Sequence, residues 1–159
     1  LEKDEPKIDP LRKMNIYCSY VSMFVILGEY EKTLEWHERQ LSEPTAPGID
    51  DMRLICYLCH LIAHYELGNF ALIESLCRSA QRKLGDKNFP TETERVFTKF
   101  IQKVPAPDKE KQHWQDFKAA LIEIKTGNQE EVKFDFFDFE LWVESKIQDR
   151  PLKEMFDIV

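Results

Sequence analysis

The sequence predicts an all-α domain of about seven helices, arranged as stacked antiparallel helical hairpins closed by a helical C-terminal cap. Three observations support this prediction. Apolar residues recur at intervals of three and four along most of the chain, which is the spacing of amphipathic helices. Glycine or proline ends most of these segments, and an acidic or hydroxyl residue begins several of them. The pattern of the first half also repeats after 40 residues.

The first predicted hairpin covers residues 9–42. Its first helix begins at Asp9-Pro10, an N-cap followed by a proline at the first helical position, and ends at Gly28. The broad apolar face of this helix consists of Met14, Tyr17, Val21, Phe24, Ile26 and Leu27. Residues 42–48 form the loop after the second helix, whose apolar side consists of Tyr30, Leu34, His37 and Leu41.

The second predicted hairpin covers residues 50–85. We expect Asp50 or Asp51 to cap its first helix, which runs to Leu67 and is turned by Gly68. The following helix ends at the close of this range. Its apolar residues are Leu72, Ile73, Leu76, Cys77, Ala80 and Leu84.

The C-terminal helices are predicted within residues 91–148. Residues 91–94, TETE, form a capping box that begins a helix, and Pro105 ends it. Asp108 caps the next helix, which Gly127 follows. The apolar faces of these two helices consist of Val96, Phe97, Phe100, Ile101 and Val104, and of Trp114, Phe117, Leu121 and Ile124.

Residues 134–143, FDFFDFELWV, carry the one competing strand signal. Their alternation of aromatic and acidic residues breaks at Phe136-Phe137, whereas Phe136, Phe139, Val143 and Ile147 recur at helical intervals. We therefore predict a seventh helix, capped by Asp135, whose aromatic face closes the end of the stack. The alternative is a peptide that docks into the groove of another protein.

An internal repeat connects the two hairpins. A shift of 40 residues places Tyr17 on Tyr57, and Leu27-Gly28 on Leu67-Gly68. The segments LGEYEKTLEW and LGNFALIESL, which begin at these two leucines, resemble the central turn of tetratricopeptide repeats (TPRs). The segments HYELGNF, ESLCRSAQRKL and LWVESKI are similar to stretches of bacterial TPR-like proteins without assigned function. The resemblance implies a TPR-like α-solenoid fragment with a scaffold or adaptor role, and it supplies no catalytic residues.

The resemblance also implies roles for particular residues. Gly28 and Gly68 would be structural turns that permit a close helix crossing or a positive φ. In the TPR register, His60 and His64 point toward the partner helix of their own hairpin. The concave groove would then be lined by Asn15, Cys18, Ser22, Val25, Ile55, Leu58, Ile62 and Tyr65. Such a groove suits a peptide or helix of a partner protein, or the later helices of the chain itself fill it.

The stretch Cys56-Tyr57-Leu58-Cys59-His60 matches the C-x-x-C-H signature of covalent haem attachment. Cys56, His60 and His64 also have the spacing at which side chains of one helix converge on a zinc ion. However, apolar residues cover most of the circumference of this helix, which favours a buried helix that uses cysteine as a small apolar residue. A Cys–His nucleophilic pair has no visible orienting carboxylate. We therefore expect no cofactor and no metal, and zinc or haem binding is the alternative function.

Composition narrows the function further. The net charge of −7 argues against nucleic-acid partners, and no apolar run approaches the length of about 18 residues that a membrane span needs. The four cysteines lie in apolar, helix-like stretches, which indicates reduced thiols and a cytoplasmic location. The chain of 159 residues suits one domain, 1–159, and its start at Leu1 is compatible with a longer chain.

No phosphate-binding loop, nucleophile elbow or spaced carboxylate pair is visible in the sequence. The sequence therefore predicts a non-enzymatic protein-interaction or scaffold module. Its expected partner is a protein or peptide, and self-association is compatible with the same prediction.

Overall fold

The computed structural model describes residues 8–44, 47–83, 92–127 and 136–156. Within these ranges the chain is helical and contains no strand, which confirms the predicted all-α class. The elements are α1 (Pro10–Leu27), α2 (Tyr30–Leu41), α3 (Asp50–Glu66), α4 (Phe70–Lys83), α5 (Glu92–Ile101), α6 (Glu110–Gly127), α7 (Phe139–Ile147) and the 3₁₀ helix η1 (Leu152–Glu154).

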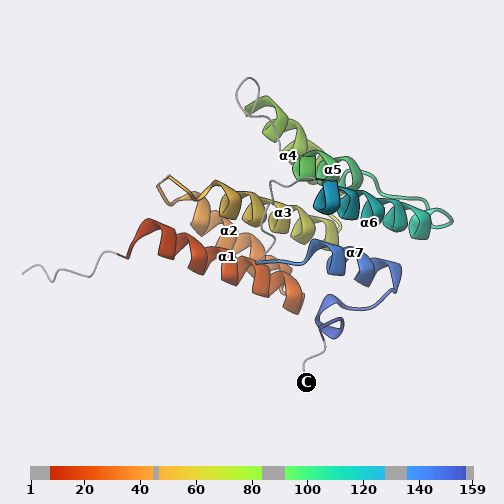
Figure 1. The fold of residues 1–159 in the computed structure, drawn as a ribbon, viewed down its shortest axis with the longest axis horizontal. Helices are drawn as coiled ribbons and strands as arrows, with labels where there is room; N and C mark the ends of the chain where they lie inside the picture. The colour runs from red at the N-terminus through yellow and green to blue at the C-terminus, as the bar shows by residue number, and fades with distance from the viewer. Residues whose placement is uncertain (1–7, 45–46, 84–91, 128–135, 157–159) are drawn as a thin grey trace, which may run out of the picture.

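The helices pack around α3. Helices α1, α2 and α3 contact one another, and α3 also contacts α4 and α5. Helix α6 lies between α5 and α7, and η1 returns to contact α1 and α7. Figure 1 shows α1 along one edge of the molecule, with α4, α5 and α6 on the far side of α3. Because α3 has neighbours on several sides, its apolar and cysteine side chains are enclosed, as the sequence predicted.

Helix α1 begins and ends as its sequence predicts. The carboxylate of Asp9 accepts a hydrogen bond of 3.1 Å from the backbone N–H of Arg12, and Pro10 occupies the first helical position. At the other end Gly28 adopts φ 76°, and the N–H of Glu29 reaches back to the carbonyl of Phe24 at 2.9 Å. This is a Schellman arrangement, in which a residue with positive φ closes the helix.

The end of α3 repeats this geometry one hairpin later in the sequence. Gly68 adopts φ 75°, its N–H donates to Tyr65 O at 3.0 Å, and the N–H of Asn69 donates to His64 O at 2.9 Å. A Cβ built on Gly68 would meet no atom within 4 Å. The glycine is therefore required for its backbone conformation, and the alternative role of a close helix crossing does not apply at this position.

The predicted caps of α3 and α7 were placed on the wrong residues. Ile49 occupies the N-cap position of α3, and Asp50 and Asp51 lie in the first turn, where their charges face the positive end of the helix dipole. Asp138 caps α7, because its carboxylate accepts a hydrogen bond of 2.9 Å from Leu141 N. The predicted cap, Asp135, lies outside the described residues.

Other predicted ends compare as follows. Helix α6 begins at Glu110, two residues after the predicted cap Asp108, and it includes Gly127. The predicted end of the fourth helix at Gly85 and the start of the capping box at Thr91 both fall outside the described residues.

The C-terminal helices close the core with aromatic side chains. Trp142 of α7 is buried, and its indole Nε1 donates to the carboxylate of Glu66 on α3 at 2.8 Å. Phe97 of α5 stacks on Trp142 with ring centroids 5.8 Å apart. The prediction that the aromatic face of the seventh helix belongs to the core is confirmed, since Phe139 and Val143 are both buried.

The two glycine turns generate a first prediction. Gly68→Ala should lower the free energy of unfolding by about 1 kcal/mol, because alanine resists a positive φ. Gly127→Ala is the matched control, because Gly127 lies in α6 without a positive φ and with open space around it. This control should be neutral or stabilising by up to about 1 kcal/mol. Urea unfolding of both variants measures the difference, and equal effects would contradict the Schellman assignment.

Candidate functional site

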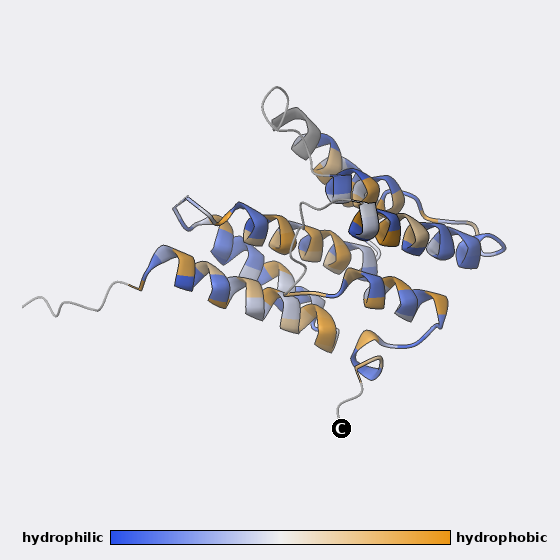
Figure 2. Ribbon diagram, viewed as in Figure 1, coloured by the Kyte–Doolittle hydropathy of each residue, from blue (hydrophilic) through white to orange (hydrophobic). Residues whose placement is uncertain are grey.

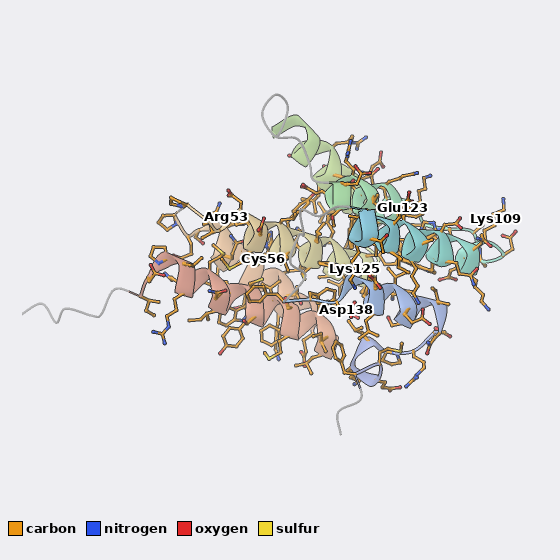
Figure 3. The ribbon with its side chains drawn as sticks, viewed as in Figure 1. Arg53, Cys56, Lys109, Glu123, Lys125 and Asp138 are labelled. Carbon is orange, nitrogen blue, oxygen red and sulfur yellow. The ribbon has the colours of Figure 1, made fainter. Side chains whose placement is uncertain are left out.

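The C-x-x-C-H stretch lies in the middle of α3, in the interior of the molecule. Cys56 and Cys59 are fully buried, and so is Cys18 of α1. Figure 3 shows Cys56 on the side of α3 that faces α1. A hydrogen bond with Cys18, together with burial, raises the pKa of Cys56, and burial raises the pKa of Cys59.

This environment is unsuited to cofactor chemistry. Haem attachment needs thiols that the porphyrin edge can reach, and zinc binds the thiolate form of cysteine. In the described part of the chain, no group of three His, Cys, Asp or Glu side chains is arranged to hold a metal ion. The cysteines instead act as small apolar side chains where α1 packs on α3.

The packing role of the cysteines generates a second prediction. The double variant Cys56→Ala with Cys59→Ala should lose about 1–2 kcal/mol of unfolding free energy and keep its helical circular dichroism, because only two buried sulfur atoms are removed. Adding a chelator to the parent protein should leave its melting temperature unchanged. A chelator-induced fall in melting temperature would show that a bound metal supports the fold.

Three histidines form a ring cluster between α2 and α3. The ring centroids of His37 and His60 are 4.4 Å apart, and those of His60 and His64 are 4.5 Å apart. The TPR register directed His60 and His64 toward α4, but His60 contacts α2, because α3 packs more extensively on α2 than on α4. The Nδ1 atom of His64 lies 3.2 Å from Asn69 Nδ2.

The cluster keeps its histidines neutral at pH 7. Burial, followed by the neighbouring His64, lowers the pKa of His37 to about 4. Burial and the two neighbouring histidines lower the pKa of His60 to about 3, and burial also lowers the pKa of His64. Protonation of one ring places a charge in a poorly hydrated site beside two other imidazoles, so the fold opposes it.

The cluster continues into a polar seam between α1, α2 and α3. Gln40 of α2 is fully buried, and Ser22 of α1 is nearly so. Among the described residues, no hydrogen-bond partner is present for the Ser22 hydroxyl, the Gln40 amide or the Nδ1 atoms of His37 and His60. Buried polar atoms of this kind lower stability, so the apolar contacts around α3 must outweigh them.

The histidine cluster generates a third prediction. The unfolded chain protonates histidine near pH 6.5, whereas the folded chain does so only near pH 4 at His37 and pH 3 at His60. The unfolded state therefore binds more protons below about pH 6.5, and stability falls as the pH is lowered toward the folded-state values. Between pH 7 and pH 5 we expect a loss of about 2–4 kcal/mol in unfolding free energy, measured by urea unfolding.

A histidine variant provides the control. His60→Gln removes one of these titrations and should reduce the difference between pH 7 and pH 5 by about 1–2 kcal/mol. The other carboxylates and histidines are unchanged in this variant, so the reduction isolates His60. A parent protein that is equally stable at both pH values would contradict the assigned burial of the cluster.

The eight residues predicted to line a groove belong largely to the core. Asn15 and Tyr65 are half-buried, and the other six are buried: Cys18, Ser22, Val25, Ile55, Leu58 and Ile62. The ring of Tyr65 lies 5.5 Å from that of Trp114 and 6.2 Å from that of Trp142. The later helices α6 and α7 therefore contact the end of this set, and its buried members present no open surface to a partner.

An exposed apolar surface lies elsewhere, on the outer side of α1. Four large apolar side chains form it, each between 40% and 48% exposed: Ile16, Tyr20, Met23 and Leu27. We call these four residues the outer stripe. They are spaced four, three and four residues apart, so they lie in one row along the helix. Figure 2 shows α1 as hydrophobic over much of its length, up to its C-terminal end at the edge of the molecule.

The outer stripe lies opposite the face that α1 buries. Met14, Cys18, Val21 and Val25 are buried and repeat the same four, three, four spacing, two residues out of step. Two residues correspond to about 200° of rotation around an α-helix, so the two rows lie on opposite sides. Surface helices of globular proteins usually carry polar residues opposite their buried face, and α1 does not follow that rule.

Aromatic and cationic side chains border the outer stripe on the side of α2. Tyr20 stacks on Trp36 with ring centroids 4.3 Å apart, and Phe24 lies 6.3 Å from the same ring. The guanidinium of Arg39 lies 5.0 Å from the Trp36 ring centroid. Tyrosine, tryptophan, methionine and arginine are enriched at protein interfaces, so both composition and exposure distinguish this surface.

The sequence contained a signal for the outer stripe that the analysis of apolar periodicity did not separate. Residues 14–27 were interpreted as one broad apolar face, whereas they contain two rows with the same spacing. Sequence patterning also did not connect His37 with His60, since these residues lie on different helices.

Comparison with known proteins adds no assignment: no protein-family model, curated protein or solved structure matches the chain. Within the described residues, no helix combines the length and the hydrophobicity needed to cross a membrane.

Proposed function

We propose that this domain is a non-enzymatic protein-interaction module of the TPR-like type. In this proposal α1 and α2 form a first antiparallel hairpin, α3 and α4 form a second, and the C-terminal helices cap the stack. Matching Schellman turns at Gly28 and Gly68, 40 residues apart, support the repeat. The four free cysteines, all buried, support a reducing, cytoplasmic environment.

The outer stripe is the observation that carries this proposal. Stacked helical repeats bury their apolar faces against neighbouring repeats, and a terminal repeat needs a polar outer face. The outer face of α1 is apolar instead, with Ile16, Tyr20, Met23 and Leu27 all partly exposed in one row. Such a face is stabilised when another helix or protein covers it. The partner surface is therefore the outside of α1 with its aromatic border on α2, in place of the groove expected from the repeat register.

Two outer-stripe substitutions provide the fourth prediction. The double variant Ile16→Ser with Met23→Ser should keep the helical circular dichroism, because both side chains are 40% exposed. It should lose the proteins that the parent domain captures from a lysate of the native organism, as quantified by mass spectrometry, because the apolar contact surface is removed.

The matched control replaces apolar residues of equal exposure elsewhere. Leu72→Ser with Ile122→Ser alters side chains that are 44% and 41% exposed on α4 and α6. This control should capture the same proteins as the parent. The proposal fails if the parent, the outer-stripe variant and the control retain the same proteins in the same amounts.

A further inference from the structure

The outer stripe has the geometry of a two-helix seam. Its spacing of four, three and four residues is the heptad spacing at which two α-helices pack along their length. It extends over about three turns, from Ile16 to Leu27. A matching surface is therefore another helix with an apolar row of similar length, more than a flat or globular face.

The charges at the two ends of α1 have opposite signs. Its first turn contains no acidic residue, and Arg12 and Lys13 follow directly. Its last turn contains no basic residue, and beyond Gly28 the chain continues with the exposed residues Glu29 and Glu31. Lys13 pairs with Glu43 at 2.7 Å and Glu29 pairs with Lys32 at 3.2 Å. No described residue forms an ion pair with Arg12 or Glu31.

We propose that the partner of the outer stripe is the outer stripe of a second copy of this chain, packed antiparallel across a twofold axis. This inference rests on the proposed function and names its partner. A second copy supplies a row of the same length, and the antiparallel orientation brings the basic end of each α1 to the acidic end of the other. The helix dipoles are also opposed in this orientation. An interface of this kind is isologous, so each contact occurs twice.

The twofold axis fixes the facing residues. If it passes midway between Tyr20 and Met23, these two residues face each other across the interface. Ile16 then faces Leu27 of the partner copy, one row outward. Arg12 lies in the same relation to Glu31, at the rim. The aromatic border around Trp36 flanks the row and widens the contact beyond α1 alone.

The first test is sedimentation velocity of the purified chain over a range of concentrations. A short helix–helix contact of this size predicts a reversible dimer with a dissociation constant on the order of micromolar. Ile16→Ser with Met23→Ser should abolish the dimer, and Leu72→Ser with Ile122→Ser should leave it unchanged. A parent chain that is monomeric at every concentration overturns the proposal, and so does a dimer that survives the outer-stripe substitutions.

Charge reversal tests the ends. Arg12→Glu or Glu31→Arg alone should weaken the dimer by about three- to tenfold, because each substitution places like charges together at both ends. The two reversals combined in one chain should restore the affinity, since each new pair again has opposite signs. Failure of the combined variant to recover overturns the antiparallel pairing of these ends.

Disulfide trapping tests the orientation with a readout that does not depend on affinity. Ile16→Cys with Leu27→Cys should give a covalent dimer under mild oxidation, and Ile16→Cys alone should not. The four native cysteines are buried and do not compete. Trapping by the single variant at the same rate overturns the antiparallel arrangement. A monomeric chain that still loses captured proteins through the outer-stripe variant would overturn only the second-copy inference and would leave the proposed function standing.

Discussion

The burial of α3 on several sides is the constraint on which the rest of the structure depends. Contacts from α1, α2, α4 and α5 enclose it, so each neighbour must present a compatible surface. Where α1 crosses α3, cysteines on both helices provide small side chains, and fully buried Cys18 lies beside Cys56 and Cys59. The C-terminal helices complete this enclosure, because Trp142 reaches back to Glu66 at the end of α3. A sequence that matches a haem-attachment signature is thereby used for helix packing.

Enclosing α3 also buries polar groups at a cost. His60 and His64 cannot face solvent once α2 lies against them, and His37 meets them from the opposite helix. Their charged forms are poorly hydrated there, and this lowers all three pKa values. The buried amide of Gln40 belongs to the same seam. The N-terminal three helices therefore combine tight apolar packing with polar atoms whose hydrogen-bonding capacity is incompletely used, which makes their stability sensitive to acid.

The second face of α1 connects the packing of the domain to its proposed role. One row of apolar residues on this helix satisfies α3, and an equal row, Ile16 to Leu27, faces outward. A helix with two apolar faces is at home between two layers, and the domain supplies only one of them. The interaction surface is thus a consequence of how α1 is built, and needs no pocket or catalytic group. The polarity of its ends, basic before the row and acidic after it, gives the surface a direction.

The sequence by itself determined what local interactions decide. The helical class, the cap at Asp9 and the turns at Gly28 and Gly68 followed from periodicity, side-chain hydrogen bonding and the conformational freedom of glycine, which all act within a few residues. Even there it had limits, since Asp149 adopts a positive φ of 50° without being glycine, and Asp138 rather than Asp135 is the residue seen to cap α7. Only the tertiary structure decided which face of α1 is buried, which rings meet His60, and that most of the expected groove residues lie in the core. Two apolar rows of the same spacing are equivalent until a neighbouring helix covers one of them, and contacts between helices depend on where each helix packs in space.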